Sequence, residues 1–531
     1  MNNKKIDWLI FAGFLCLTFF LRFPAFFQSG IGPDESIYLL MARSLTEGKP
    51  PYTEFFDNKP IGIYVLFALA LLLFGKSVLS IRIAAWIAVS ITSFLLYRIG
   101  RVISNHDYKI GLLAGIFYSF LTLGSGGISS DTEIFFAPFV VFAFYLLFLR
   151  LFRTEELNYQ NKVTLFIIGL VMGMALQIKQ VTLFEFIAIL ILVCVNLYRQ
   201  YRPHVSFLLK KIFQYYLILF LGFITPSIVV IIYYLLNGHF DDFIYANFSA
   251  NLARIGNQKW SIINFGIGFL IQVKTNLILW VALFLIPVYW LSSQDKEPEE
   301  RKKLTYLIIW FVMAFLGVFA PKSFYVHYFL QLLPSLCLLS SYLIIKTIWS
   351  AREIRTTRKL LILTLILVTP LFNIMYPYLK VGTKSIYFRF VKGISNWGDD
   401  PAIVANYLKK RVNPEDYIYV VDYLSVIYFL VPAQIPTKYA YPPFLTSDLA
   451  KVAGSNPVQE LRSILARKPV YIIKFKQDKI GSDPFYTELE KYLNRDYALE
   501  KGFPVAADSF LDEEKDPKIL ELYRLKSNLK K

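Results

Sequence analysis

Apolar runs of about twenty residues are the feature that most constrains how this chain can fold. They lie near residues 6–27, 77–98, 110–125, 133–150, 162–178, 181–198, 211–236, 263–290, 304–320, 327–346 and 359–378. A helix of about that length crosses the hydrocarbon core of a bilayer and pairs all its backbone polar groups internally. The sequence therefore predicts a polytopic α-helical membrane protein with about eleven spans.

Composition supports this class of protein. The 531 residues are 56% hydrophobic and 18% charged, whereas soluble proteins are about 45–50% apolar and about 25% charged. The net charge of +18 is explained by cations in short loops between spans, where they set orientation. We therefore predict membrane lipid as a partner and no nucleic acid.

The distribution of those cations predicts which loops face the cytoplasm. They concentrate in residues 4–5, 98–109, 150–162, 199–211, 296–303 and 346–359. The positive-inside rule places these segments in the cytoplasm of a cell (inner) membrane protein. The alternate loops, which include residues 28–76, are then extracytoplasmic. This assignment requires residues 61–74, too short to span comfortably, to lie in the interface or to re-enter.

Near residue 380 the apolar runs shorten and charged residues become more frequent. The pattern predicts helices over 401–411, 457–466 and 484–493 and strands over 417–421, 470–475 and 519–525. We therefore expect a transmembrane domain over 1–379 and a small extracytoplasmic α/β domain over 380–531.

The acidic segment 28–76 is the strongest candidate site. Asp34 and Glu35 follow a Gly-Pro turn and open a helical pattern. The helix dipole favours acids at a helix start, so capping explains one of them. Two adjacent acids at a membrane surface exceed what a cap needs, and a carboxylate can serve as a general base. Asp34 and Glu35 are therefore candidate catalytic residues, and Asp34 is the better one.

Several cations at the outer edge of the spans could hold a phosphate. Lys59 precedes residues 61–74, Arg82 lies one turn into a span, and Lys179 lies between two spans. Snorkelling to the interface explains any one of them, but several together suit an anionic headgroup. His327 and Tyr328 begin a later span and are weaker candidates, for which an aromatic belt is the alternative explanation.

Two further acids extend the candidate set. Asp131 lies in the short loop before the span at 133–150, followed by Glu133. Such acids at the edge of hydrocarbon either cap a helix or face a cavity. Asp57 is a possible ligand for a divalent metal, because carboxylate oxygens suit Mg²⁺ or Mn²⁺.

The position of these charges bears on the function class. A transporter more often places charges at the bilayer midplane, with broken helices in paired positions. Here the charges gather near one face, which favours chemistry at a lipid headgroup. A purely structural membrane protein is disfavoured by the acidic segment.

The order of short motifs resembles that of bacterial integral-membrane glycosyltransferases of the type-C (GT-C) fold, relatives of the protein O-mannosyltransferases and of the lipid A aminoarabinose transferase. The motifs are Gly32-Pro33-Asp34-Glu35-Ser36, Pro50-Pro51-Tyr52, Asp57-Asn58-Lys59-Pro60, Leu73-Phe74-Gly75-Lys76-Ser77, Arg82, His327-Tyr328-Phe329-Leu330, Tyr428-Phe429-Leu430 and Pro436-Thr437-Lys438-Tyr439. The first-loop motifs are the most specific of these.

The resemblance implies transfer of a sugar from a polyprenyl phosphate donor to a glycan, lipid or protein acceptor at the outer face of the membrane. Asp34 would be the base, Asp131 and Glu133 would support the acceptor or the base, and Lys59 would contact the donor phosphate. Displacement would be direct, with inversion. Relatives often carry Glu where this chain has Asn58, which leaves Asp57 as a possible stand-in for metal binding.

Two alternatives stay open at this point. The chain could be a transporter or flippase of polyprenyl-linked sugars, for which an acidic site facing the cytoplasm would be expected. It could also be an oligosaccharide polymerase or ligase, which would use the same donor with a saccharide acceptor.

Overall fold

The computed structural model describes residues 3–124, 126–153, 159–257, 259, 261–292, 298–349, 364, 376–476, 483–505 and 518–528. By internal contacts the chain forms two compact units that alternate along the sequence. Unit 1 comprises residues 1–23, 84–233 and 259–379, and unit 2 comprises residues 24–83, 234–258 and 380–531.

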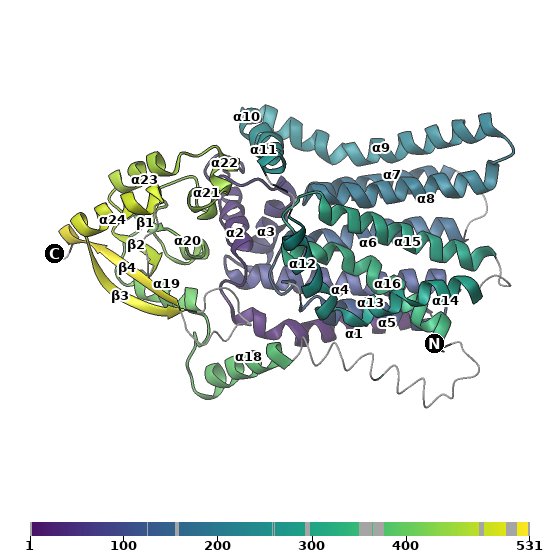
Figure 1. Cartoon of the computed structure of the whole chain (residues 1–531), viewed down its shortest axis with the longest axis horizontal. Coiled ribbons are helices and arrows are strands. Elements are labelled where there is room, and N and C mark those ends of the chain that lie inside the picture. The colour runs from purple at the N-terminus through teal and green to yellow at the C-terminus, as the bar shows by residue number, and fades with distance from the viewer. Residues whose placement is uncertain are drawn as a thin grey trace. The chain divides into compact units, whose positions relative to one another are not determined.

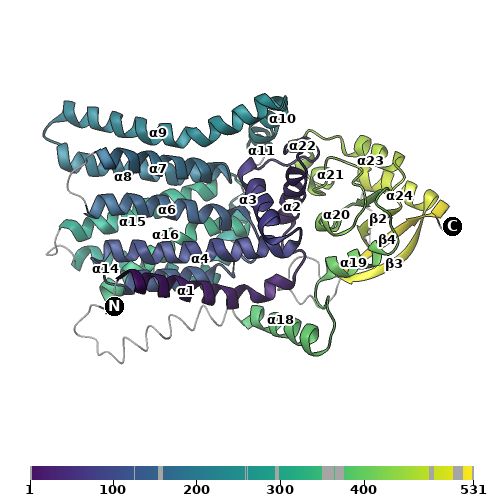
Figure 2. The same cartoon turned by 180° about the vertical axis from the view of Figure 1, so that it is seen from behind.

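Unit 1 is helical, and its long helices run side by side (Figures 1 and 2). Its elements are α1 (Asn3–Arg22), most of α4 (Val78–Ile103), α5 (Lys109–Leu121), α6 (Thr132–Arg153), α7 (Tyr159–Leu176), η2 (Gln180–Thr182), α8 (Leu183–Tyr201), most of α9 (Val205–Leu236), α12 (Ile262–Thr275), α13 (Leu277–Leu283), α14 (Leu285–Ser292), α15 (Pro298–Phe319), η4 (Val326–Leu332), α16 (Leu333–Leu343) and η5 (Ile344–Trp349).

The described residues contain seven helices long and apolar enough to cross a membrane, or eight if one bent pair counts as a span. A multi-pass membrane protein is thereby confirmed, but the predicted count of about eleven is too high for this part of the chain. The predicted spans at 110–125 and 162–178 are short apolar helices, Lys109–Leu121 and Lys162–Leu176. The predicted span at 359–378 lies almost wholly outside the described residues.

The predicted span at 263–290 is broken. Helices Ile262–Thr275 and Leu277–Leu291 meet at an angle of 95°. Asn276 lies at the break and donates its side-chain N–H to Gln272 Oε1 at 2.8 Å, while Gln272 donates to the carbonyl of Val326 at 3.1 Å. These amides are buried and lie at the break. The prediction of one span used only the apolar length of this segment, which does not reveal a break at a polar pair.

Glycines let the helices of unit 1 pack backbone to backbone. A Cβ atom built on Gly100 of α4 would collide with the backbone of Gly111 in α5, and one on Gly169 of α7 would collide with the carbonyl of Leu219 in α9. Small residues at such crossings let membrane helices approach closely. The helix scaffold of unit 1 therefore depends on these positions.

Unit 2 combines short helices with a mixed sheet. Its elements are η1 (Phe23–Phe27), α2 (Pro33–Thr46), α3 (Ile61–Phe74), α10 (Phe240–Ile244), η3 (Tyr245–Ser249), α11 (Ala250–Asn257), α18 (Tyr376–Ile386), η7 (Tyr387–Val391), α19 (Asp400–Lys409), β1 (Ile418–Val420), α20 (Val426–Leu430), α21 (Pro443–Thr446), α22 (Leu449–Ala453), α23 (Pro457–Ala466), β2 (Tyr471–Phe475), α24 (Pro484–Asp496), β3 (Tyr497–Val505), β4 (Lys518–Leu525) and η8 (Lys526–Asn528). The first residue of η1, Phe23, and the first residues of α18, up to Leu379, belong to unit 1.

The sheet has the strand order β1-β2-β4-β3. Strands β1 and β2 are parallel, with Tyr419 opposite Ile472, and β4 is antiparallel to both β2 and β3. The predicted helices at 401–411, 457–466 and 484–493 are confirmed as α19, α23 and α24, and the three predicted strands as β1, β2 and β4. Strand β3 was missed because its sequence contains charges, a glycine and Pro504, which edge strands tolerate.

Residues early in the chain are tied directly to the C-terminal segment within unit 2. The side chain of Asp399 accepts hydrogen bonds from the backbone N–H (3.1 Å) and hydroxyl (2.8 Å) of Ser29. The backbone N–H of Phe56 donates to the carbonyl of Lys438 at 2.9 Å. Unit 1 ends at Leu379, where we predicted the domain boundary, but unit 2 also includes residues 24–83 and 234–258. The division into domains at 379/380 stays a prediction.

Asp422 ties the end of β1 to the end of β2. Its Oδ1 atom accepts the backbone N–H of Phe475 at 2.7 Å, and Oδ2 accepts the hydroxyl of Tyr486 at 3.4 Å. Burial nevertheless raises the pKa of Asp422 to about 6. The folded protein therefore holds this proton more tightly than the unfolded chain does.

We expect Asp422→Asn to remove a pH-dependent loss of stability. The pKa of Asp422 in the folded protein lies above its unfolded value of 3.8, so the protonated side chain contributes its full stabilisation below that pH. This stabilisation is lost as pH rises through about 6. Between pH 4 and 7 the free energy of unfolding should fall in the wild type relative to the variant, by an amount on the order of 3 kcal/mol. Unfolding of the full chain in detergent, followed across this pH range, measures it.

The control is Asp448→Asn, because the side chain of Asp448 is exposed near Lys451. That variant should keep the pH dependence of the wild type. Parallel stability curves for the wild type and Asp422→Asn would contradict the prediction.

Candidate active site

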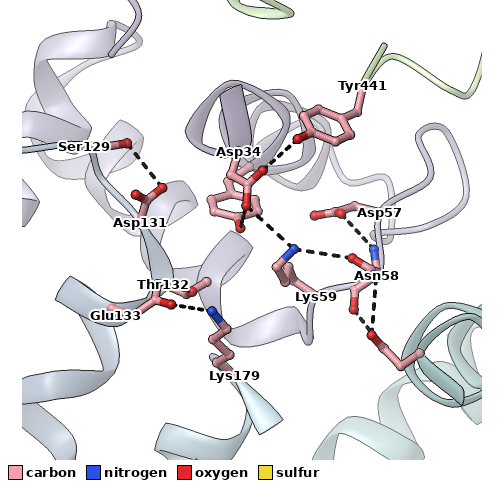
Figure 3. Close-up of polar contacts among 12 residues, drawn as sticks. Asp34, Asp57, Asn58, Lys59, Ser129, Asp131, Thr132, Glu133, Lys179 and Tyr441 are labelled. Carbon is pink, nitrogen blue, oxygen red and sulfur yellow. Dashed lines mark hydrogen bonds and ion pairs between the residues drawn. The ribbon is translucent and has the colours of Figure 1, made fainter. Parts of the chain in front are cut away.

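Asp34 lies in the first turn of α2 within unit 2. Its Oδ1 atom accepts a hydrogen bond from the Tyr441 hydroxyl at 2.9 Å, and Oδ2 accepts one from the Tyr38 hydroxyl at 3.3 Å. The Lys59 Nζ atom lies 3.9 Å from Oδ2. Figure 3 shows the Asp34 carboxylate between Tyr441 and Lys59. The side chain of Asp34 keeps 22% of its surface exposed, so a substrate could reach it.

Lys59 is held by the residues around it. Its backbone carbonyl accepts the hydroxyls of Tyr52 (2.7 Å) and Tyr64 (3.1 Å). Its amino group lies 3.4 Å from Asn58 Oδ1 and 5.8 Å from the centre of the Tyr38 ring. Lys59 is 9% exposed, so its charge is placed by the fold.

Asp57 is buried, and both its carboxylate oxygens accept hydrogen bonds. Oδ1 accepts the backbone N–H of Asn58 and Oδ2 accepts the Tyr64 hydroxyl, each at 2.8 Å. Burial raises the pKa of Asp57, and the nearby Lys59 charge opposes that rise. Within the described ranges, no three His, Cys, Asp or Glu side chains gather as ligands for a metal ion. Both carboxylate oxygens of Asp57 are therefore already engaged within the protein, and metal binding at Asp57 stays a prediction.

Asn251 of α11 completes this part of the site. Its side-chain N–H donates to the carbonyl of Asn58 at 2.9 Å, and its Oδ1 accepts the Asn58 side chain at 3.3 Å. Asn251 and Tyr441 were not singled out in the sequence, whereas Tyr38 closes the Gly-Pro-Asp-Glu-Ser-x-Tyr motif that begins at Gly32. Their types are common in this chain, and Asn251 and Tyr441 lie far from Asp34 in sequence.

Glu35 and Arg82 form a buried ion pair. The Arg82 Nη2 atom lies 2.5 Å from Glu35 Oε1, and Arg82 Nη1 pairs with Oε2. Glu35 also accepts the backbone N–H of Ile31 (2.8 Å) and Gly32 (3.3 Å), which caps the start of α2. Arg82 donates further to the carbonyl of Gln28. These contacts fix α2 against the first turn of α4, while the predicted roles of Glu35 in catalysis and of Arg82 in phosphate binding stay predictions.

The remaining candidates belong to unit 1. Lys179 pairs with Glu133 at the start of α6 (Figure 3). Its amino group lies 3.9 Å from the centre of the Tyr328 ring. The rings of His327 and Tyr328 are 4.7 Å apart. Asp131 accepts the hydroxyl of the nearby Ser129 at 3.2 Å. Lys179, His327 and Tyr328 thus form one group with Glu133, which the sequence had suggested only as separate residues.

Residues 58–232 match the profile of a family described as dolichyl-phosphate-mannose-protein mannosyltransferase. The matched part contains Lys59, Arg82, Asp131 and Lys179, but Asp34 lies before it. No curated protein matches the chain.

Solved structures resemble the whole chain. ArnT from Cupriavidus metallidurans bound to undecaprenyl phosphate superposes with a TM-score of 0.58 and 14% identity, covering 98% of each chain. The chain has the type-C glycosyltransferase fold. The apo state of ArnT gives a TM-score of 0.54 and 13% identity over 98% of each chain. The archaeal oligosaccharyltransferase AglB from Archaeoglobus fulgidus, in complex with an inhibitory peptide and a dolichol-phosphate, gives 0.51 and 12% identity over 88% of this chain and 69% of AglB.

These matches confirm the predicted resemblance to type-C membrane glycosyltransferases, by the fold of the whole chain and by the family profile over residues 58–232.

We expect breaking the Glu35–Arg82 pair to destabilise unit 2 strongly. Both side chains are at most 2% exposed, so Glu35→Gln or Arg82→Met leaves its partner charge buried without compensation, which costs about 3–5 kcal/mol. Thermal or denaturant unfolding in detergent measures the loss.

Lys49→Ala serves as the matched control, because the Lys49–Glu54 pair is exposed, with side-chain exposures of 49% and 34%. Surface pairs contribute about 0–1 kcal/mol. Equal losses in the Lys49 and Arg82 variants would argue against a structural part for the buried pair.

Proposed function

We propose that the protein transfers a sugar from a polyprenyl-phosphate-linked donor to an acceptor hydroxyl, with Asp34 as the general base. The observation that carries this proposal is the placement of a partly exposed carboxylate 3.9 Å from a fixed lysine within one compact unit. A base and a phosphate-binding cation are the two groups that such a transfer needs side by side.

The proposed step is a direct displacement with inversion. The acceptor hydroxyl gives its proton to Asp34, and its oxygen attacks the anomeric carbon of the donor sugar. A new C–O bond forms as the bond between that carbon and the phosphate oxygen breaks, and the phosphate leaves with the electron pair. Lys59, a compact cationic donor, stabilises the charge that develops on the leaving phosphate.

The choice of donor is supported by the related structures, since ArnT was solved with undecaprenyl phosphate and AglB with a dolichol-phosphate. Glycan, lipid and protein acceptors all fit the step as written. The loop cations support an extracytoplasmic position for the site. A related Archaeoglobus fulgidus oligosaccharyltransferase structure holds Zn and sulfate, but no step here is assigned to a metal.

Lys179, His327 and Tyr328 are proposed as a second phosphate-binding group, and Asp131, two residues before Glu133, as a residue that supports the base. Their support is the gathering of a lysine, an imidazole and a tyrosine around one buried carboxylate, that of Glu133. Since Lys179 already pairs with Glu133, a phosphate in this group would share that cation.

One observation bears on the transport alternative. The bent pair at residues 262–291 is a broken helix of the kind that transporters use. Transporter folds repeat such breaks in paired positions, whereas this is one pair among the described residues. Transfer is therefore the better-supported function, and a labelled-donor assay separates it from transport.

We expect Asp34→Asn to reduce sugar transfer by about 10²–10⁴-fold, because an amide cannot take the acceptor proton. The assay follows a labelled sugar from its polyprenyl phosphate carrier to endogenous acceptors in membranes containing the full chain. Binding of undecaprenyl phosphate should be unchanged. Transfer at the wild-type rate would exclude Asp34 as the base, and Asp448→Asn serves as the control for a surface carboxylate.

Lys59→Gln should instead weaken donor binding. Removing a charge-assisted contact to the donor phosphate is expected to raise the Kd for undecaprenyl phosphate by about tenfold or more. The Kd is measured on the purified protein in detergent, with Lys49→Ala as the control for an exposed lysine. An unchanged Kd would remove Lys59 from the proposed phosphate site.

A further inference from the structure

A pocket of about 320 Å³ adjoins the candidate base in unit 2. Pro33, the neighbour of Asp34, lines it, as does Tyr441, whose hydroxyl donates to Asp34 Oδ1. The volume is near the lower end of the range of about 300–1,000 Å³ that small-molecule sites occupy. A group the size of a sugar ring therefore has room beside Pro33 and Tyr441, the two lining residues next to Asp34.

The walls of this pocket favour a neutral, hydroxyl-rich group. Two carboxylates, those of Asp400 and Asp422, line it together with the aromatic rings of Tyr423 and Phe475 and the hydroxyl of Thr446. No lysine, arginine or histidine is among its described lining residues. Carboxylates accept strong hydrogen bonds from hydroxyls, and they repel a phosphate.

A second pocket in unit 2 shows the opposite character. It has a volume of about 450 Å³ and is lined by Lys76, Arg389 and Lys409 with Asp399. An anionic group would be favoured there by charge. The contrast shows that the lack of cations among the residues lining the 320 Å³ pocket is a property of that pocket rather than of the whole unit.

The two oxygens of Asp34 separate two sides of the candidate site. Oδ2 lies near Lys59, where the donor phosphate is proposed to bind. Oδ1 lies against Tyr441, which also lines the 320 Å³ pocket. If the donor phosphate binds on the Lys59 side, the Tyr441 side remains for the acceptor, whose hydroxyl gives its proton to Asp34.

We propose that this pocket binds the acceptor, and that the acceptor is an uncharged glycan ring rather than a phosphate group. The inference rests on the proposed function, because it takes Asp34 as the base. The acceptor hydroxyl reaches Asp34 from the Tyr441 side, its ring packs on Phe475 or Tyr423, and its other hydroxyls donate to Asp400 and Asp422. Tyr441 acts as a positioning residue that orients the Asp34 carboxylate.

The test measures binding without the donor. Saturation-transfer NMR on the full chain in detergent uses methyl α-D-mannoside and methyl β-D-glucoside as probes, and ³¹P line broadening follows the binding of inorganic phosphate. We expect signals from at least one glycoside in the wild type. Thr446→Trp, which fills the pocket, should reduce the glycoside signal roughly tenfold, and Asp400→Asn should do the same without added bulk.

Two controls belong to this experiment. Asp448→Asn lies outside the pocket and Lys409→Gln alters the cation-lined pocket, so both should keep the glycoside signal. The proposal would be overturned if neither glycoside bound to the wild type. It would also be overturned if both pocket variants left the glycoside signals unchanged. Loss of the ³¹P line broadening of inorganic phosphate in Asp400→Asn would also overturn it.

A kinetic measurement separates this inference from the proposed function. In the transfer assay, Asp400→Asn should raise the acceptor KM while the donor KM stays constant, whereas Asp34→Asn should lower the rate at saturating acceptor. If Asp34→Asn is inactive but Asp400→Asn raises only the donor KM, the pocket holds the donor sugar and the acceptor assignment fails. If Asp34→Asn is fully active, the proposed function fails whatever the glycosides do.

Discussion

A buried ion pair determines where the candidate base stands. Glu35 belongs to the first turn of α2, where Asp34 directly precedes it, and Glu35 pairs with Arg82 at the start of α4. Because Glu35 also caps the helix through the N–H groups of Ile31 and Gly32, its carboxylate fixes the start, the rotation and the packing of α2 together. The two adjacent acids thus have different surroundings. Glu35 is buried and holds the start of the helix, whereas Asp34 is partly exposed in the candidate site.

The contacts of Asp34 and Glu35 differ in a way that bears on the alternatives left open by the sequence. Capping and catalysis were alternative explanations for the same two residues, and the geometry assigns capping contacts to Glu35 and the partly exposed position to Asp34. Lys59 is positioned by other contacts, because two tyrosine hydroxyls donate hydrogen bonds to its backbone carbonyl. Acid and cation are therefore positioned by independent supports within unit 2.

Helices that begin at a clear local sequence pattern were predicted correctly. The Gly-Pro turn with an acid three positions after Gly32 marks the start of α2, and the apolar run after Pro60 marks α3 with its bounds. Span counting was less successful, because hydropathy measures apolar length and is blind to the Gln272–Asn276 amides that break a helix. The site was predictable as far as Asp34 and Lys59, which lie in one segment. Asn251 and Tyr441 could not be found, since their contacts depend on how distant segments pack.

The hydrogen bond from Tyr441 to Asp34 joins residues 407 positions apart. Contacts of such separation form late, because the chain between them must be ordered first. During synthesis the first acidic segment is thus exposed long before its tyrosine partner exists. The full set of contacts around the Asp34 carboxylate can be completed only once most of the polypeptide has been inserted and the C-terminal segment has folded, so a nascent or truncated chain carries the acid without its finished surroundings.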